Sequence, residues 1–107
     1  MNTFYRLANR LIFACLCVLL PISTIAHAAD VVKGEELYMA NCAGCHGEGG
    51  FSIMQEAPNL SRFDMGNQPD EDLIEIIESG RGSMPPYIGI LNESEILDLV
   101  SYLRTLN

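Results

Sequence analysis

Two of the four cysteines in this chain stand two residues apart and are followed directly by a histidine, in the run Cys42-x-x-Cys45-His46. Cysteines this close together cannot join distant parts of the chain, so the fold has to be held by something else. A zinc site would need four ligands, and a thioredoxin-like redox pair would need a strand–helix framework. A third use of this spacing is attachment of a haem, in which each sulfur adds to one vinyl group and the histidine reaches the iron.

Residues 1–28 have the layout of a secretory signal peptide. A positively charged start is followed by the apolar run 11–20, by Pro21, and by small residues that end at Ala28, where cleavage is expected. An uncleaved membrane anchor is the alternative, but the apolar run is shorter than the roughly 20 residues that a spanning helix needs. The sequence therefore predicts export to the periplasm with residues 29–107 as the mature domain and no stable membrane anchor.

The mature segment is short and strongly acidic. All 14 acidic residues lie in it, and its basic residues are Lys33, Arg62, Arg81 and Arg104, so four positive charges against fourteen negative ones give a net charge of −10. This charge excludes electrostatic binding to nucleic acid or to an anionic membrane surface, and it favours a partner protein with a basic face. Because so short a domain buries a marginal core, we expect a large prosthetic group in its middle.

Three helical segments are predicted in the mature chain, and the pattern gives no convincing strand. The first covers about residues 31–43. The second follows Pro69, with three acidic residues on its first turn and Gly80 as its C-terminal cap. The third begins at Asn92, with Glu95 placed for a capping box and apolar residues recurring at intervals of three and four. The expected fold is therefore a small all-α domain with long connections.

Processing removes the competing ligands. Residues 29–107 contain no histidine besides His46 and no cysteine besides Cys42 and Cys45, so a zinc ion would need a carboxylate ligand. Haem attachment is the favoured interpretation of the motif. A second axial histidine is excluded unless the signal is retained with its His27.

A methionine is therefore the candidate for the other face of the iron. Met39 is too near the attachment site, and Met54 and Met65 lie in loops, where a methionine ordinarily fills gaps in a core. Met84 follows a helix in a loop shaped by glycines and prolines, which can hold a thioether at the iron. We predict Met84 as the ligand, with Met65 second and an open position third.

Three further motifs carry a family resemblance: Gly34-x-x-x-Tyr38, Pro58-Asn59-Leu60 and Gly80-x-Gly82-x-Met84-Pro85. Together with the haem motif, they resemble class I cytochromes c of the small bacterial periplasmic mono-haem type, over essentially all of residues 29–107. The resemblance implies that Gly34 lets the last helix cross closely and that Met84 lies in the methionine loop. It also implies that the Pro58 carbonyl accepts a hydrogen bond from His46 and makes the ring a better iron ligand.

The predicted function is transfer of single electrons, without catalysis, by one haem c that is bound through Cys42 and Cys45 and ligated by His46 and Met84. Redox proteins are the expected partners, and the chain is expected to be a monomer or a subunit of a redox complex. One alternative is a dedicated cytochrome subunit of a larger dehydrogenase or oxidase. The other is a haem enzyme or gas sensor with a labile sixth ligand.

Two charged features have more than one interpretation. Arg81, beside the methionine loop, either pairs with a haem propionate or is an exposed arginine at a helix end. The acidic residues of segment 70–78 either form a docking face or are simply the solvated side of a helix.

Overall fold

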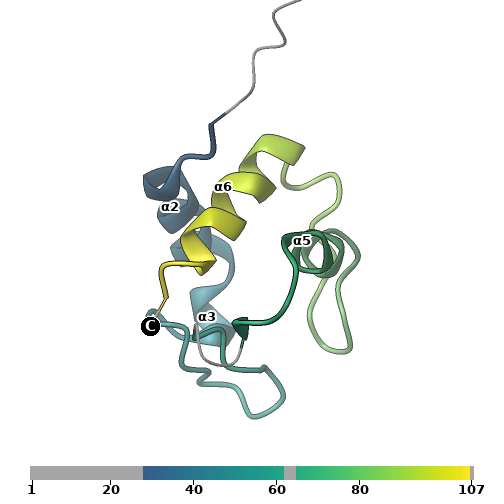
Figure 1. Ribbon diagram of the computed structural model, residues 1–107. Helices are drawn as coiled ribbons and strands as arrows, with labels where there is room; N and C mark the ends of the chain where they lie inside the picture. The colour runs from purple at the N-terminus through teal and green to yellow at the C-terminus, as the bar shows by residue number, and fades with distance from the viewer. Residues whose placement is uncertain (1–27, 62–64, 107) are drawn as a thin grey trace, which may run out of the picture.

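The computed structural model describes residues 28–61 and 65–106, and within them it contains four α-helices (Figure 1). They are α2 (Val31–Asn41), α3 (Ala43–His46), α5 (Asp70–Ser79) and α6 (Glu93–Leu103). Extended pairing among the described residues is limited to two isolated bridges within one loop, so the all-α prediction is confirmed. The expected signal peptide, apart from Ala28, lies outside the described residues.

The first helix is shorter than the sequence predicts. It was expected to run to residue 43, but α2 ends at Asn41, and a turn at Cys42 separates it from α3. The Asn41 side chain donates to the Leu37 carbonyl at 2.9 Å, a local bond that short polar side chains make at helix ends. The backbone N–H groups of Cys45 and His46 then bond to the Cys42 carbonyl and begin the new short helix.

The predicted ends of the other two long helices are confirmed. Gly80 is the C-terminal cap of α5, with φ at +72°. Asn92 caps α6: its side chain accepts from the Glu95 N–H at 3.0 Å, and the Glu95 carboxylate accepts from the Asn92 N–H at 2.9 Å. This reciprocal pair is a complete capping box, which fixes where the helix begins.

Helices α2 and α5 lie on opposite sides of α6 (Figure 1). Gly34 of α2 allows the close crossing with α6, and the rings of Tyr38 and Tyr102 pack next to it with their centroids 5.2 Å apart. The remaining core is supplied mainly by α6, whose apolar positions face both neighbours: Ile96, Leu99, Val100, Leu103 and, just beyond the helix, Leu106. The apolar spacing that predicted this helix therefore also marks its buried side.

Candidate cofactor site

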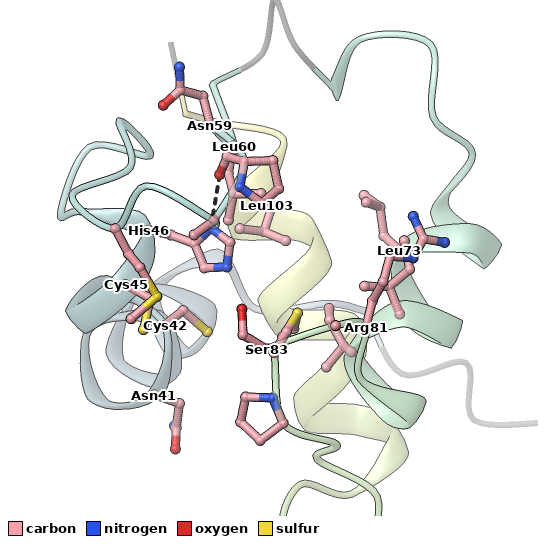
Figure 2. A pocket seen from close by; sticks show the side chains of 18 of the residues that line it. Asn41, Cys42, Cys45, His46, Asn59, Leu60, Leu73, Arg81, Ser83 and Leu103 are labelled. Atoms are coloured by element: carbon pink, nitrogen blue, oxygen red, sulfur yellow. Dashed lines mark hydrogen bonds between the residues drawn. The ribbon is translucent and has the colours of Figure 1, made fainter.

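A cavity of about 780 Å³ lies between α3, α5, α6 and the loops that join them. The five site residues predicted from the sequence all line it: Cys42, Cys45, His46, Pro58 and Met84. Apolar side chains of α5 and α6 make up much of the remaining wall, among them Leu99 and, as Figure 2 shows, Leu73 and Leu103. Chain folding thus brings together the five predicted site residues, which are up to 42 positions apart in the sequence.

Cys42 and Cys45 are free thiols on one wall of the cavity, with His46 beside them (Figure 2). The short helix α3 places them there, because it starts directly after Cys42 and ends at His46. Burial, together with the neighbouring Cys45, raises the pKa of the Cys42 thiol to about 11. Because Cys42 and Cys45 lie on the same side of the cavity, both of their sulfurs could bond to one flat ligand.

His46 is buried, and its orientation is fixed by a hydrogen bond. Its Nδ1 lies 3.0 Å from the carbonyl oxygen of Pro58. Because a carbonyl can only accept, Nδ1 is the protonated nitrogen, and Nε2 keeps the lone pair that a metal would need. The second ring nitrogen faces the cavity (Figure 2). The ring is therefore held in the tautomer and orientation of a metal ligand.

The loop after α5 holds Met84 half-buried on the cavity wall. A tight turn closes it, with the Arg81 N–H donating to the Met84 carbonyl at 3.1 Å and the Met84 N–H donating to the Arg81 carbonyl at 2.9 Å. The next residues bind back to α5, since the Tyr87 N–H donates to the Ile77 carbonyl at 3.0 Å. Backbone hydrogen bonds within the loop and to α5 therefore define the path of the chain around Met84.

The other methionines of residues 29–107 differ in position. Met65 is buried and lines the same cavity, and Met54 lines it while being 44% exposed. Met39, also 44% exposed, is not among the lining residues. Two methionine side chains besides Met84 are therefore present in the cavity wall.

Tyr87 is a lining residue that sequence reasoning missed. Its hydroxyl donates to the Asn41 carbonyl at 2.8 Å and so ties the methionine loop to the end of α2, next to the first cysteine. Burial is the main cause that raises its pKa. A tyrosine after two prolines carries no sequence signal for this contact, because its partner lies 46 residues away.

The structure shows where Arg81 and the acidic residues of segment 70–78 lie. Arg81 is exposed and lines the cavity. On α5, the side chains of Asp70, Glu71, Asp72 and Glu75 are exposed, and Asp70 pairs with Arg104 at 2.6 Å.

The residues of the cavity fit a haem. The cavity size is within the usual range of about 300–1,000 Å³ for ligand sites, and its wall is largely apolar. The two thiols can each add to one vinyl group of a haem, and an imidazole with a free nitrogen and a thioether are donors that suit its iron.

Comparison with known proteins identifies the family. Residues 29–103 match the family model described as "Cytochrome C oxidase, cbb3-type, subunit III". The chain belongs to this family of cytochrome c domains. It is 34% identical to cytochrome c6 of Nostoc sp. over 84 residues, which cover 76% of this chain and 75% of the relative.

Solved structures agree with this assignment. Cytochrome c6 of the diatom Phaeodactylum tricornutum is 28% identical, with a TM-score of 0.62, and the match covers 70% of this chain and 91% of that one. Cytochrome cL of Hyphomicrobium denitrificans is 33% identical, with a TM-score of 0.59, over 69% of this chain and 45% of that one. The predicted small cytochrome c fold is therefore confirmed.

Family membership establishes the chemistry of the motif in this cytochrome. It carries one covalent haem c at the Cys42 and Cys45 positions, and it is an electron carrier that exchanges electrons with redox partners. Within residues 28–61 and 65–106, no helix is both long and apolar enough to cross a membrane.

Proposed function

We propose that residues 29–107 act as a periplasmic electron carrier in which His46 and Met84 are the two axial ligands of the haem iron. Cys42 and Cys45 provide the thioether bonds, and Pro58 orients His46. If both side chains hold the iron, no position on it would be left for a substrate.

The observation that carries this proposal is the hydrogen bond between His46 Nδ1 and the Pro58 carbonyl at 3.0 Å. It leaves the lone pair of Nε2 free to bind a metal on the cavity side. A hydrogen bond of this kind makes an imidazole a stronger ligand and prevents the ring from turning away. Met84, held by a closed turn in a loop that lines the same cavity, is the partner that the loop geometry favours.

When bound, the haem supplies the one-electron couple of its iron. The chain contributes the environment of that couple. The Met84 thioether is a soft donor that favours the reduced state and raises the reduction potential. Leu99 and Leu103, both buried, keep water from the apolar wall, which favours the less charged centre further.

Substitution of Met84 by Ala tests the ligand assignment. We expect loss of the charge-transfer band of Met–iron ligation at the red edge of the ferric spectrum. We also expect a potential lower by on the order of 0.1 V, a fraction of the roughly 0.8 V range that axial ligands cover.

Met54→Ala is the matched control, because Met54 also lines the cavity but is exposed, and it should keep the band. Loss of the band in Met65→Ala and its survival in Met84→Ala would transfer the assignment to Met65. Rapid binding of carbon monoxide by the unmutated reduced protein would instead point to a labile sixth position.

Export is the second part of the proposal. Residues 1–28 are expected to be removed, so mass spectrometry of the haem-loaded protein from the periplasmic fraction should find Ala29 as its first residue. Recovery of the intact chain in the membrane fraction would support a retained anchor instead.

A role as a subunit of an oxidase is the second candidate, and two comparisons favour it. The family description names an oxidase subunit, and FixP of Bradyrhizobium diazoefficiens, a cbb3-type oxidase subunit, is 38% identical over 80 residues, although the match covers only 28% of that protein. Purification from its native membrane and periplasmic fractions distinguishes the two roles. A free carrier elutes alone, whereas a subunit elutes in a fixed ratio with other chains.

A further inference from the structure

Arg104, directly after α6, binds three acceptors in the segment that leads into α5. Its Nε and Nη2 donate to one Asp70 carboxylate oxygen at 2.9 and 2.6 Å. Its Nη1 donates to the Met65 carbonyl at 3.2 Å, and Nη2 also donates to the Gln68 carbonyl. The planar guanidinium thus joins the end of one helix to the start of another with several charge-assisted bonds.

The acceptors belong to the wall of the haem cavity. Met65 and Gln68 both line the cavity, and so does Leu103, the neighbour of Arg104 on α6. Met65 is only 5% exposed, so its side chain is inside while its carbonyl is held by the arginine. Arg104 therefore holds the backbone of this part of the wall from the outside.

Helix α5 connects the segment that Arg104 binds to the loop that holds Met84. It begins at Asp70, which Arg104 binds, and ends at Ser79, directly before the turn that presents Met84. Tyr87, after the turn, binds back to the Ile77 carbonyl of the same helix. A helix is a stiff element, so a shift at its start moves the loop at its end.

An exposed ion pair by itself contributes little, because water screens the charges and the side chains lose freedom. Arg104 differs from such a pair in its number and kind of acceptors. Two of them are backbone carbonyls, and the arginine side chain is only 33% exposed. Removal of the guanidinium would leave these carbonyls without that donor as well as break the ion pair.

We propose that Arg104 is a positioning residue for the methionine ligand. By fixing the start of α5 against α6, it sets how firmly the loop after α5 presents Met84 to the iron, and it keeps Met65 in the wall. This proposal rests on the assignment of Met84 as the axial ligand.

Displacement of the methionine by imidazole in the ferric holoprotein tests it, with the Met–iron band as the readout. In Arg104→Gln, we expect half-displacement at an imidazole concentration about tenfold lower, the change in equilibrium typical for loss of a charge-assisted hydrogen bond. Arg104→Lys should recover part of the effect, because an ammonium supplies the charge but not the planar fork. Asp70→Asn should have a smaller effect, since both carbonyl bonds remain. It also serves as the informative variant if Arg104→Gln does not fold.

Two controls separate positioning from general stability. Asn92→Ala removes the N-terminal cap of α6 and lowers the stability of the same helix, and it should leave the imidazole midpoint unchanged. Lys33→Gln removes an exposed ion pair with Glu36 on α2 and should also change nothing. A midpoint in Arg104→Gln equal to that of the unmutated protein, or an equal shift in Asn92→Ala, would overturn the proposal.

The same titration distinguishes the two assignments. If Met84→Ala keeps the band, the ligand assignment itself fails. If Met84→Ala loses the band while Arg104→Gln and Asp70→Asn bind imidazole as the unmutated protein does, only the role of Arg104 fails.

Discussion

Gly34 of α2 lies directly against the backbone of Asp98 in α6, so closely that a Cβ built on Gly34 would stand 2.1 Å from the Asp98 carbonyl oxygen. The contact is with backbone, so no change of rotamer can relieve it. Asp98 is itself buried, and its carboxylate accepts from the Asp30 N–H at 2.7 Å, next to the start of α2. The crossing of the two helices is therefore fixed at two levels. It places the first helix, and the haem motif that follows it, relative to α6.

Substitution of Gly34 by Ala should lower the free energy of unfolding of the holoprotein by about 3 kcal/mol, the upper end of ordinary overpacking, because the helices have to separate. Denaturant titration measures the change. Gly44→Ala is the matched control, since a Cβ at that position in α3 meets no atom within 4 Å. Equal stability of the two variants would mean that the crossing can relax without cost.

Tyr38 should make the folded protein lose stability as the pH rises above 10. The side chain is fully buried, its hydroxyl donates to the Gly47 carbonyl at 2.6 Å, and burial is the main cause that raises its pKa from 10 to about 12. A raised pKa means that the folded state keeps a proton that the unfolded state loses. The stabilisation is therefore complete below pH 10 and is lost as the pH rises towards 12, at up to about 1.4 kcal/mol per pH unit.

Tyr38→Phe should remove this alkaline loss and cost about 1–2 kcal/mol at neutral pH, because the buried Gly47 carbonyl loses its donor. Thermal unfolding of both proteins from pH 7 to 12 measures the two effects. A parallel decline of both curves above pH 10 would assign the alkaline loss to another group.

Substitutions at Gly80 and Gly82 distinguish backbone strain from steric contact in the methionine loop. Both have positive φ, +72° and +60°, but a Cβ at Gly80 would stand 2.5 Å from the Met84 carbonyl oxygen, whereas at Gly82 it meets nothing within 4 Å. Gly80→Ala should therefore weaken the Met–iron band, and Gly82→Ala should keep it at a cost of about 1–2 kcal/mol in unfolding free energy. Absorption spectra and denaturant titration measure both. The opposite order would show that the turn is not what holds Met84.

Electron exchange should depend on salt. With a partner that has a basic face, we expect the bimolecular rate to fall about tenfold between low and physiological ionic strength, as salt screens the attraction. Stopped-flow kinetics measures it, and an acidic partner should show the opposite trend. The position of the negative charges can also be tested. If the net charge of the domain steers the partner, changing Glu71 and Asp72 on α5 to amides should slow electron exchange no more than changing Glu35 and Glu36 on α2. A larger effect on α5 would make that helix a docking face.

Local chemistry along the chain was enough to predict several features. The capping box of Asn92 and Glu95, the glycine cap of α5 and the buried spacing of α6 depend on residues within a few positions of one another. For that reason, these three predictions were confirmed. The same applies to haem attachment at Cys42 and Cys45, which stand within one turn of each other. The predicted end of the first helix was two residues too late, because the chain turns at Cys42 and the N–H groups of Cys45 and His46 bond to the Cys42 carbonyl to begin α3.

The sequence by itself determined that a haem is attached through Cys42 and Cys45. It also determined that a small helical domain surrounds this haem. The tertiary structure decided which distant side chains meet around that haem. The Pro58 carbonyl against His46, the Tyr87 hydroxyl on Asn41 and the Arg104 guanidinium on the segment before α5 join residues 12 to 46 positions apart. Such contacts have no period or spacing in the sequence, because they depend on how the helices cross and not on the local path of the chain.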